Sequence, residues 1–594
     1  MRTTSTLLAM MFTGVLGMQA AVANDSAHKP IDVLLQQTVT TTDGTELAAT
    51  VWKPDADDKR YTAVLVVTPY VSDEAQARGR IYVDRGYALV SLDRRSRGAS
   101  DGPHEVLTDV GPDACAAIAW IKQQPWSDGR VAMRGGSYRG MSQWMTARAC
   151  PDELETIMPT ASVYPGHSDF PLGPGLVSYK YTARWLSFVA GPTRNINLFS
   201  DEAYWQERAL TSYRQHLPFH QYDAFVGYPS PIFQKWVETL SEPAQWDSYT
   251  IPADAYAAMD MPILTITGHY DGDQLGALGY YRQHQASAQR KPKRDHHLVL
   301  GPWDHAGTRV PRQRLSESVE FGANAAFDMD QFNLDWLDWT LGRGPKPELL
   351  TKGRVVYYVG GANEWRYADD LDAVAAETHS LFLSAAPDEA ADVFRSGHLL
   401  GEPVSSDEPH TFINDPLDTS PADLTEENWG TLANGNFRKD WAAHMPETLV
   451  FHSSPLPDEQ VMAGQMKLTL YLEMDAPDTD IFATVAAVFP DGEILHLGAS
   501  VVRARFRNGL EPELVEPGVV EPYVFDTFFW NAWALPAGAR IRLTVGPFND
   551  PMYQKNYNSG GKLGFETADD ARVATIKLHH NSEYPSVLEI PLAE

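Results

Sequence analysis

The residues with the clearest chemical potential surround Ser137, which stands in the segment Gly135-Gly136-Ser137-Tyr138-Arg139-Gly140. This segment follows the short apolar stretch Val131–Arg134 and precedes a run that can be helical. A serine at such a position fits a nucleophile elbow, a strained turn that lifts the hydroxyl above a sheet edge. The usual elbow has glycine two positions to either side of the serine, but Arg139 holds the second of these positions. Ser137 is therefore a candidate nucleophile, with an ordinary glycine-rich turn as the alternative.

A serine nucleophile needs a base to take its proton, and a histidine base needs a carboxylate to hold its tautomer. Two later apolar stretches are followed by suitable residues: Asp271 comes after Ile263–Gly268, and His305 comes after His297–Gly301. The order serine, acid, histidine is the order of α/β-hydrolase chains. We therefore predict a catalytic triad of Ser137, Asp271 and His305.

Short β-branched runs alternate with helical patterns from about Val33 to Arg343, which predicts an α/β domain with a mostly parallel sheet. The remaining clear strands of this part are Ala63–Thr68 and Ala88–Asp93, and Phe327–Leu341 has the spacing of a final helix. In such sheets ligands bind beyond the carboxyl ends of the strands. The three triad candidates all follow strands at that edge.

Two further regions interrupt or follow this alternation. Residues 162–249 are rich in Trp, Tyr, Phe and Pro and predict an inserted, largely helical cap, whose aromatic residues either line a pocket or form the cap's own core. After Pro345, short alternating strands such as Leu468–Leu472, Phe482–Phe489 and Ile541–Val545 predict an all-β sandwich or jelly roll. We therefore predict an α/β-hydrolase domain at residues 24–345 and a β domain at residues 346–594.

Length, charge and the N-terminus limit the class of protein. A chain of 594 residues is too long for one core, and its net charge of −30 repels phosphate backbones, which argues against nucleic acid as a partner. Residues 1–23 combine Arg2, an apolar run from Leu7 to Val15 and the small residues before Asn24, as in a signal peptide cleaved after Ala23. A membrane anchor is the alternative, although the run is shorter than the roughly 20 residues of a span. We expect a periplasmic or secreted protein without stable membrane insertion.

Cys115 and Cys150 are the only cysteines. They could form a disulfide in an oxidising compartment, or they could remain as two buried thiols. A zinc or redox site is disfavoured because the chain has no Cys-x-x-Cys pair.

Several blocks of the sequence resemble those of the CocE/NonD hydrolases, which include cocaine esterase, α-amino acid ester hydrolases and Xaa-Pro dipeptidyl-peptidase-like enzymes. The blocks in the first domain are Thr68-Pro69-Tyr70, Gly86–Val90, Trp126–Val131, Gly136-Ser137-Tyr138-x-Gly140, His269-Tyr270-Asp271 and Gly301-Pro302-Trp303-x-His305. Those in the second domain are Asp478–Asp480, Val488–Gly492, Arg503–Phe506 and Leu535–Leu543. The resemblance covers nearly all of the mature chain and implies the Ser-Tyr-x-Gly form of the elbow.

The resemblance also implies roles for residues around the triad. Tyr70 would donate its phenolic hydrogen to the oxyanion together with the backbone N–H of Tyr138, although a buried tyrosine bonded to backbone is the alternative for Tyr70. Trp303 is expected among the substrate-binding residues. The basic run Arg94–Gly98 departs from the family pattern, and we expect it to have a structural role.

Two carboxylates bear on the choice of acyl group. Asp273 lies where α-amino acid ester hydrolases carry an acidic residue for the substrate ammonium, and Asp169 is a second candidate for such a clamp. A solvated turn and a helix cap are the alternatives, and Gln274 stands where a third acidic residue is expected. A calcium loop is disfavoured because the other EF-hand ligands are missing, so no metal or cofactor is predicted.

The sequence thus predicts a serine hydrolase that cleaves acyl esters or amides through an acyl-enzyme, with α-amino acyl groups as the favoured donors. The alternative within enzymes is an Xaa-Pro dipeptidyl-peptidase, and a remote alternative is a non-catalytic carbohydrate-binding protein. The expected partner is a small ester, amide or short peptide. The sequence leaves open whether the chain forms a homo-oligomer.

Overall fold

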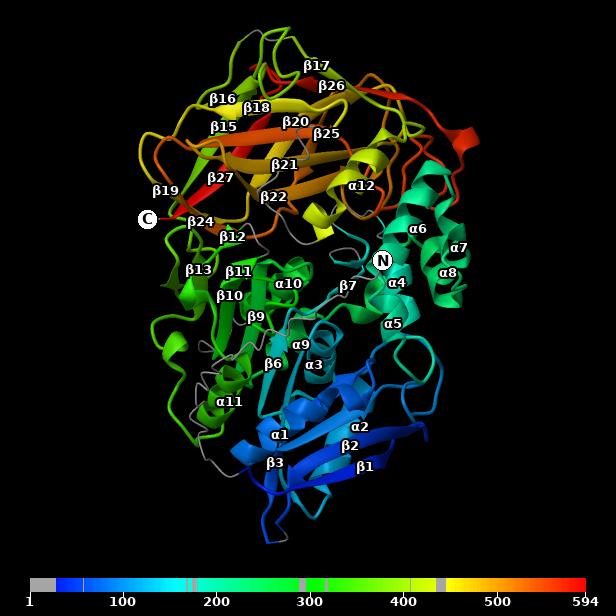
Figure 1. The fold of residues 1–594 in the computed structure, drawn as a ribbon, viewed down its shortest axis with the longest axis vertical. Helices are drawn as coiled ribbons and strands as arrows, with labels where there is room; N and C mark the ends of the chain where they lie inside the picture. The colour runs from blue at the N-terminus through cyan, green and yellow to red at the C-terminus, as the bar shows by residue number, and fades with distance from the viewer. Residues whose placement is uncertain are drawn as a thin grey trace, which may run out of the picture.

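The computed structural model describes residues 28–593, apart from 57, 167–168, 174–177, 179, 288–294, 316–318, 406–407 and 434–444. The signal peptide predicted at residues 1–23 lies outside the described residues. Within the described chain, none of the helices combines the length and the apolar character that crossing a membrane requires. An α/β domain, a helical cap beside it and a β domain above it make up the molecule (Figure 1).

The α/β domain is built on one ten-stranded sheet in the order β1-β2-β4-β3-β5-β6-β9-β10-β13-β14. From β4 to β13 neighbouring strands are parallel, while β1, β2 and β14 are antiparallel to their neighbours. The strands are β1 (Ile31–Thr40), β2 (Glu46–Pro54), β3 (Tyr61–Thr68), β4 (Ala88–Asp93), β5 (Ser127–Gly136), β6 (Thr156–Thr160), β9 (Ile263–Tyr270), β10 (His296–Asp304), β13 (Val355–Val359) and β14 (Glu364–Ala368). The parallel sheet predicted from the sequence is confirmed.

Helices cover both faces of this sheet, which explains why central strands such as β3, β4 and β9 are buried along their length rather than alternating. In β3, Val64 and Val66 pack into the core beneath α1 (Gln76–Arg85) and α11 (Met329–Thr340). Leu65 and Val67 point to the other face, into the core beneath α2 (Gly111–Lys122) and α3 (Tyr138–Ala149). Every residue of β3 is therefore buried.

The first sheet extends beyond the domain boundary predicted at residue 345. Strand β13 lies parallel to β10, and β14 closes the edge by antiparallel pairing with β13. Residues 355–368 therefore pair with the α/β sheet, although they follow the domain boundary predicted from the sequence. Strands of the second sheet begin at Glu377.

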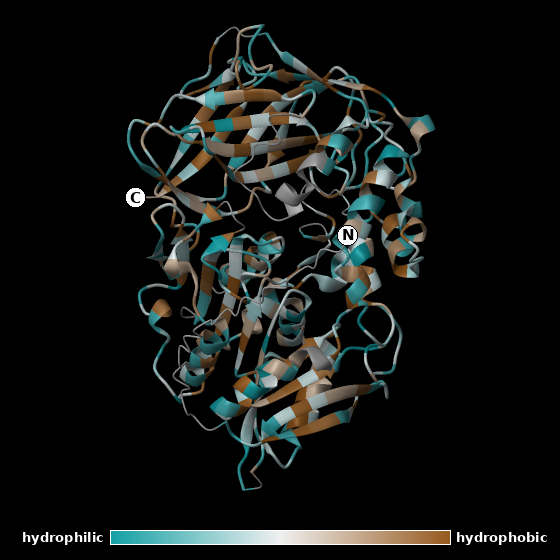
Figure 2. Cartoon of the chain, in the orientation of Figure 1, coloured by the Kyte–Doolittle hydropathy of each residue, from teal (hydrophilic) through white to brown (hydrophobic). Residues whose placement is uncertain are grey.

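The β domain contains a second sheet of thirteen strands. They are β15 (Glu377–Ser384), β16 (Gly397–Leu400), β17 (His410–Asn414), β18 (Leu449–Ser453), β19 (Gln460–Gly464), β20 (Lys467–Met474), β21 (Asp480–Val488), β22 (Ile494–Arg503), β23 (Glu521–Phe525), β24 (Asn531–Leu535), β25 (Arg540–Pro547), β26 (Ala574–His579) and β27 (Val587–Ala593). In β20 every second side chain is buried, as expected for a sheet with one face toward a core. Hydrophobic residues mark the strands of both sheets (Figure 2).

Two buried ion pairs lie at one end of the β domain, where β21 begins and β22 ends. Arg503 donates two hydrogen bonds of 2.7 Å to Asp480, and Arg505 donates one of 2.7 Å to Asp478. The amide of Asn556 bridges the two carboxylates at 2.9 and 2.8 Å. Both carboxylates are fully buried, so each charge depends on its arginine.

The cap predicted at residues 162–249 is helical. It consists of α4 (Tyr181–Phe188), α5 (Ile196–Phe199), α6 (Glu202–Arg214), α7 (Tyr222–Phe225) and α8 (Pro231–Glu238), and α9 (Ala253–Ala258) leads back to β9. These helices lie beside the α/β domain and below the β domain (Figure 1). Trp185 and Trp236 both pack in the cap core, and Trp185 also lines the cavity described below. The cap aromatics therefore serve both predicted purposes.

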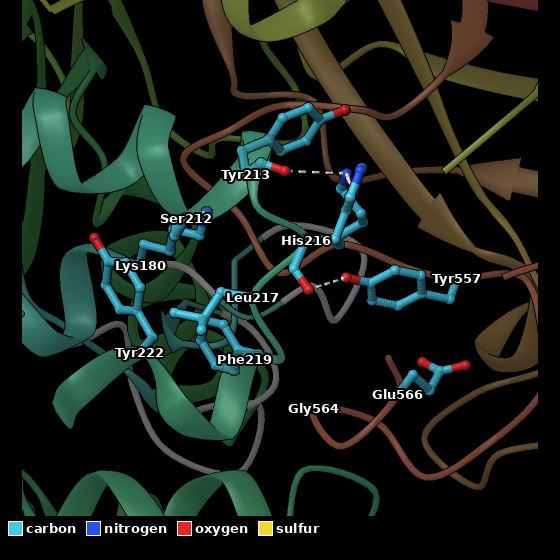
Figure 3. A pocket seen from close by; sticks show the side chains of 11 residues that line it. Lys180, Ser212, Tyr213, His216, Leu217, Phe219, Tyr222, Tyr557, Gly564 and Glu566 are labelled. Carbon is cyan, nitrogen blue, oxygen red and sulfur yellow. Dashed lines mark hydrogen bonds between the residues drawn. The ribbon is translucent and has the colours of Figure 1, made fainter. Parts of the chain in front are cut away.

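The buried Lys180 (Figure 3) and the partly buried Lys555 lie where the cap meets the β domain. Lys180 Nζ donates to Ser212 Oγ at 3.0 Å and to the Pro551 carbonyl at 2.7 Å. Lys555 Nζ donates to the Pro416 carbonyl at 2.8 Å and lies 3.0 Å from His216 Nδ1. Burial lowers the pKa of both lysines to about 7.

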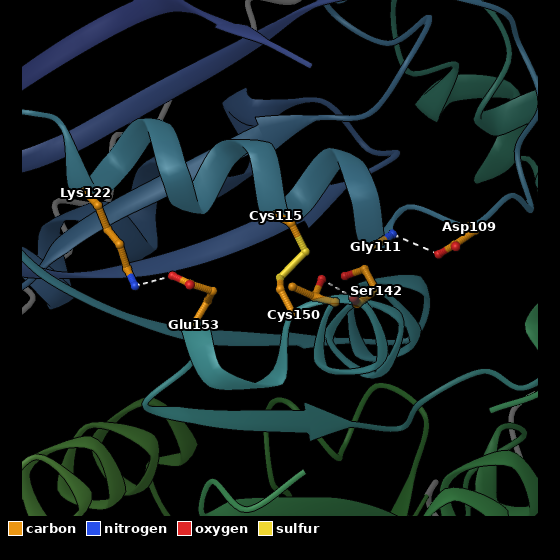
Figure 4. Close-up of a disulfide and its surroundings, with 8 residues drawn as sticks. Asp109, Gly111, Cys115, Lys122, Ser142, Cys150 and Glu153 are labelled. Atoms are coloured by element: carbon orange, nitrogen blue, oxygen red, sulfur yellow. Dashed lines mark hydrogen bonds and ion pairs between the residues drawn. A yellow bond between two sulfur atoms is a disulfide. The ribbon is translucent and has the colours of Figure 1, made fainter. Parts of the chain in front are cut away.

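Cys115 and Cys150 form a disulfide (Figure 4). Cys115 lies within α2, and Cys150 directly follows α3, with their Cα atoms 6.2 Å apart. Of the two alternatives left open by the sequence, the structure contains the cross-link. It joins the helix that begins at the candidate nucleophile to its neighbour on the same face of the sheet.

Candidate active site

Ser137 lies in a sharp turn between β5 and α3, with φ 63° and ψ −127°. This left-handed backbone is strained for any residue with a side chain. The Ser137 N–H donates to the carbonyls of Thr160 at 3.0 Å and Ala161 at 2.9 Å, which holds the turn against β6. The geometry is that of a nucleophile elbow.

Two glycines explain why the elbow has its unusual spacing. A Cβ atom at Gly135 would lie 2.5 Å from the Cβ of Arg139, and one at Gly140 would lie 2.4 Å from Ser162 Oγ. Helix α3 therefore approaches β5 and the start of the cap closely at both positions. Because Gly140 faces Ser162, the second glycine is required there and not at position 139.

His305 and Asp271 form a short hydrogen bond beside the elbow. Asp271 Oδ1 lies 2.7 Å from His305 Nδ1, and Thr267 Oγ1 donates to Asp271 Oδ2 at 2.8 Å. Burial alone would raise the pKa of Asp271, but His305 and then Thr267 hold that pKa below its ordinary value. Burial likewise disfavours the imidazolium, yet Asp273 and Asp271 raise the pKa of His305. The pair can therefore accept a proton on Nε2 and stabilise the resulting charge.

Asp273 lies between the nucleophile and the histidine. Its Oδ2 lies 3.5 Å from Ser137 Oγ and 3.6 Å from His305 Nδ1. Burial, followed by the charge of Asp169, raises the pKa of Asp273 well above its ordinary value. Burial also raises the pKa of Asp169, although its Oδ2 accepts the Tyr164 N–H at 2.9 Å. The two predicted clamp residues thus lie in one electrostatically coupled group.

Tyr70 and Tyr138 are the predicted oxyanion donors. Tyr70 follows β3, its ring stacks on Phe188 at 5.5 Å between centroids, and its hydroxyl accepts a 3.4 Å hydrogen bond from Trp185 Nε1. A tyrosine hydroxyl can accept one hydrogen bond and donate another, so this contact is compatible with the predicted donation to an oxyanion. Tyr138 is the first residue of α3, where backbone N–H groups have no partner within the helix.

The basic run Arg94–Gly98 supports the segment that carries Tyr70. Arg97 is fully buried, and its Nε donates to the Pro69 carbonyl at 2.6 Å. The same guanidinium donates to the carbonyls of Gly191 and Thr193 in the cap. The predicted structural role of this run therefore corresponds to a connection between Tyr70 and the cap.

A cavity of about 820 Å³ opens above these residues. Ser137, His305, Tyr70, Tyr138, Asp273 and Asp169 all line it. Phe529 and Tyr553 of the β domain also line it, so all three parts of the chain contribute to its wall. Trp303 does not: it is 2% exposed, its Nε1 donates to the Ala325 carbonyl at 2.8 Å, and it packs toward α11.

Gln274 replaces the third acidic residue of the expected clamp and has a different set of contacts. Its Nε2 donates to the Trp530 carbonyl at 2.8 Å, and its Oε1 accepts the Trp530 N–H at 2.7 Å. It lies at the start of α10 (Gln274–Ser287), immediately after Asp273. Gln274 therefore ties the segment that carries Asp271 and Asp273 to the β domain.

Asp271, Asp273 and His305 are also close enough to be considered as metal ligands, since one atom of each lies within 4.8 Å of the others. However, the Nδ1 atom that His305 turns toward both carboxylates already forms the 2.7 Å hydrogen bond with Asp271. This contact has the length of a charge-assisted hydrogen bond. We describe the group as a proton-transfer arrangement.

Four arginines at the cavity wall were not predicted as site residues from the sequence. Arg78, Arg139, Arg309 and Arg312 line the cavity from α1, α3 and the turn after β10. Arg139 is visible within the Ser137 motif, but the others are surface-type residues in segments without a motif. Only the folded chain brings them together.

Comparisons with known proteins agree with this architecture. Residues 43–307 match the family model described as X-Pro dipeptidyl-peptidase (S15 family), and residues 350–589 match the X-Pro dipeptidyl-peptidase C-terminal non-catalytic domain. The chain is 27% identical to cocaine esterase of Rhodococcus sp. (strain MB1 Bresler), over 93% of this chain and 96% of that protein.

Solved structures share the fold over the whole chain. An α-amino acid ester hydrolase superposes with a TM-score of 0.77 at 18% identity, covering 98% of this chain and all of the other. An aminopeptidase from a marine sediment Thaumarchaeota archaeon also gives 0.77 at 21% identity, covering 100% of this chain and 99% of the other. The arrangement of two domains and a cap is therefore shared with enzymes of this type.

Proposed function

We propose that this chain, which belongs to the X-Pro dipeptidyl-peptidase (S15) family of serine hydrolases and is similar to cocaine esterase, hydrolyses α-amino acyl esters or amides. The observation that supports this proposal is that Asp273 Oδ2 lies 3.5 Å from Ser137 Oγ, with a second partly buried carboxylate, Asp169, nearby. An ammonium group beside the reacting carbonyl would neutralise this pair.

In the proposed reaction Ser137 Oγ attacks the acyl carbon while His305 Nε2 takes the hydroxyl proton. Asp271 holds the imidazole in the required tautomer and balances its charge. The carbonyl oxygen becomes an oxyanion, which the Tyr70 hydroxyl and the Tyr138 N–H stabilise. The leaving group departs with the proton from His305, and a water molecule activated by the same histidine then hydrolyses the acyl-enzyme.

Asp273 has a second part in this scheme. The contact of 3.5 Å from Ser137 Oγ competes with the orientation of the hydroxyl toward His305. An α-ammonium would take over Asp273 through a shorter, charge-assisted hydrogen bond and release the hydroxyl. Asp273 would thereby favour α-amino acyl substrates both by binding them and by freeing the nucleophile.

The triad is tested by Ser137→Ala with a fluorophosphonate probe and an activated ester such as p-nitrophenyl acetate. We expect the variant to lose labelling and to lose ester hydrolysis by several orders of magnitude, with an unchanged circular dichroism spectrum. Turnover at the wild-type rate by the folded variant would refute the assignment of Ser137.

The clamp is tested by Asp273→Asn on matched alanyl and acetyl esters of one phenol. We expect KM for the alanyl ester to rise more than KM for the acetyl ester, because only the alanyl ester carries an ammonium. Equal changes in both values would exclude Asp273 as the ammonium partner.

The second candidate is release of Xaa-Pro dipeptides from peptide N-termini, which the description of the matching family model favours. The same carboxylates could bind a peptide N-terminus. A panel of a phenylglycine methyl ester, an ampicillin-type amide and an Ala-Pro anilide separates the two, since only the second candidate requires proline before the scissile bond.

We also propose that the chain is exported through the signal peptide at residues 1–23. The Cys115–Cys150 disulfide supports this proposal, because such cross-links persist in oxidising compartments. Mass spectrometry of the purified protein should find Asn24 as the first residue. An intact N-terminus in the cytoplasmic fraction would contradict export.

A further inference from the structure

The charge of the active-site cavity is opposite to that of the whole chain. The net charge is −30, yet the four arginines Arg78, Arg139, Arg309 and Arg312 line the cavity. The two carboxylates on its wall, Asp169 and Asp273, both have a pKa raised well above the ordinary value. A positive cleft in an acidic protein concentrates anions at that cleft.

Arg309 lies directly against the nucleophile elbow. A Cβ atom built on Gly136 would lie 3.2 Å from its Cδ and 3.4 Å from its Nη1. Gly136 directly precedes Ser137 in the chain, and Arg309 and Ser137 line the same cavity. Two residues after Ser137, the Arg139 guanidinium carbon lies 5.3 Å from the centre of the Tyr70 ring.

Arg309 and Arg312 belong to the turn that follows His305. The Arg309 N–H donates to the Ala306 carbonyl at 3.1 Å, which folds the turn beneath the cavity. In acyl transfer the leaving group lies beside the imidazole that protonates it. These two arginines therefore lie on the leaving-group side of Ser137.

The charged groups near these two guanidinium groups are Asp273, which interacts electrostatically with Arg309, and the residues around Arg78. Arg78 faces Asp330, with 3.4 Å from its Nε to Oδ1, and Asp330 is shared with Arg134 at 3.0 Å. In the part of the chain that the structure describes, neither Arg309 nor Arg312 has a carboxylate within 4.0 Å. A planar, two-oxygen anion is the ligand that a guanidinium pairs with best.

We propose that Arg309 and Arg312 form a subsite for a carboxylate carried by the leaving group, as in a short peptide that ends next to the scissile bond. This inference rests on the serine-hydrolase function proposed above and adds the chemical class of the leaving group. The preferred substrate would then be zwitterionic, with its ammonium at Asp273 and its carboxylate at the arginines.

Four synthetic esters test this subsite: alanyl and acetyl esters of 3-hydroxybenzoate, and the same two esters of 3-hydroxybenzamide. The two phenols have similar shapes, but only the benzoate carries a carboxylate. We expect kcat/KM to be about 10- to 100-fold higher for the benzoate than for the benzamide, with either acyl group. A ratio of one or less in the wild type would overturn the proposal.

Arg309→Gln should bring the benzoate-to-benzamide ratio of kcat/KM toward one. Adding Arg312→Gln to this variant should lower the ratio further when it is measured at low salt. Arg314→Gln is the matched control, because it removes the same charge from the same segment at a residue outside the cavity wall. A change in His305 protonation would alter both esters alike, so the ratio isolates leaving-group binding. An unchanged ratio in Arg309→Gln would refute the role of this residue.

The outcome also separates this inference from the proposed function. A benzoate preference without an alanyl preference would remove the ammonium clamp and keep the arginine subsite. If no ester is hydrolysed, the proposed function fails, and binding to Ser137→Ala decides the subsite. Tighter binding of 3-hydroxybenzoate than of 3-hydroxybenzamide, lost on Arg309→Gln, would support it, and equal binding would refute it.

Discussion

The disulfide between Cys115 and Cys150 permits a quantitative prediction, because the loop that it closes contains the candidate nucleophile. The two cysteines are 35 residues apart in the chain. The loop-closure entropy of a cross-link over that separation corresponds to about 4 kcal/mol at 25 °C. The double variant Cys115→Ser, Cys150→Ser should lose this contribution, since its unfolded chain regains the freedom that the cross-link removes.

The expected change in melting temperature depends on the size of the unit that unfolds. An unfolding entropy of about 2.1 cal/mol/K per residue gives a decrease of about 6 °C for a unit of about 340 residues. This is the size of the α/β domain with its cap. If the whole chain unfolds together, the decrease is about 3 °C.

Differential scanning calorimetry should compare the oxidised wild type, the wild type treated with dithiothreitol and the double variant. The reduced wild type should melt near the variant, and the variant should not respond to dithiothreitol. Neither cysteine lines the cavity, so kcat at 25 °C should change less than twofold. A variant that melts within about 1 °C of the oxidised wild type would refute the loop-closure reasoning.

Three further changes test other parts of the structure. Tyr70→Phe should lower kcat about 10²- to 10³-fold with little change in KM, and an unchanged kcat would exclude its hydroxyl from the oxyanion site. Burial lowers the pKa of Lys180 to about 7, so the folded protein releases this proton before the unfolded chain does, and stability should rise from about pH 7 to 10. Lys180→Met should reduce that slope by up to about 1.4 kcal/mol per pH unit, and urea titrations with identical slopes would contradict this. Asp480→Asn should lower the free energy of unfolding by about 3–5 kcal/mol, because it leaves Arg503 buried without its carboxylate, and an unchanged urea midpoint would show that this pair contributes little.

The order and position of the site residues could be predicted because each follows a strand of a parallel sheet. Ser137, Asp271 and His305 come after β5, β9 and β10, and the carboxyl ends of these strands meet at one edge. The glycine spacing of the elbow could be matched to a family, but its cause could not be read from the sequence. That cause is the close approach of Gly140 to Ser162, which is a tertiary contact.

Other features depended on information that a linear pattern does not contain. Val355–Val359 is an apolar run that could join either sheet, and only its pairing with β10 places it in the first. Trp303 is two residues from His305, but it lies within β10 and packs toward α11, whereas His305 follows the strand end. Proximity in sequence therefore did not bring Trp303 to the cavity.

The reciprocal hydrogen bonds between Gln274 and Trp530 have a consequence for attempts to divide or recombine this enzyme. They fasten the β domain to the residue that follows Asp273, and the same domain supplies Phe529 and Tyr553 to the cavity wall. Removal of the β domain would therefore open one wall of the active-site cavity. It would also loosen the segment that holds Asp271 and Asp273. Exchange of catalytic domains between relatives should preserve specificity only when these loops of the β domain are transferred with them.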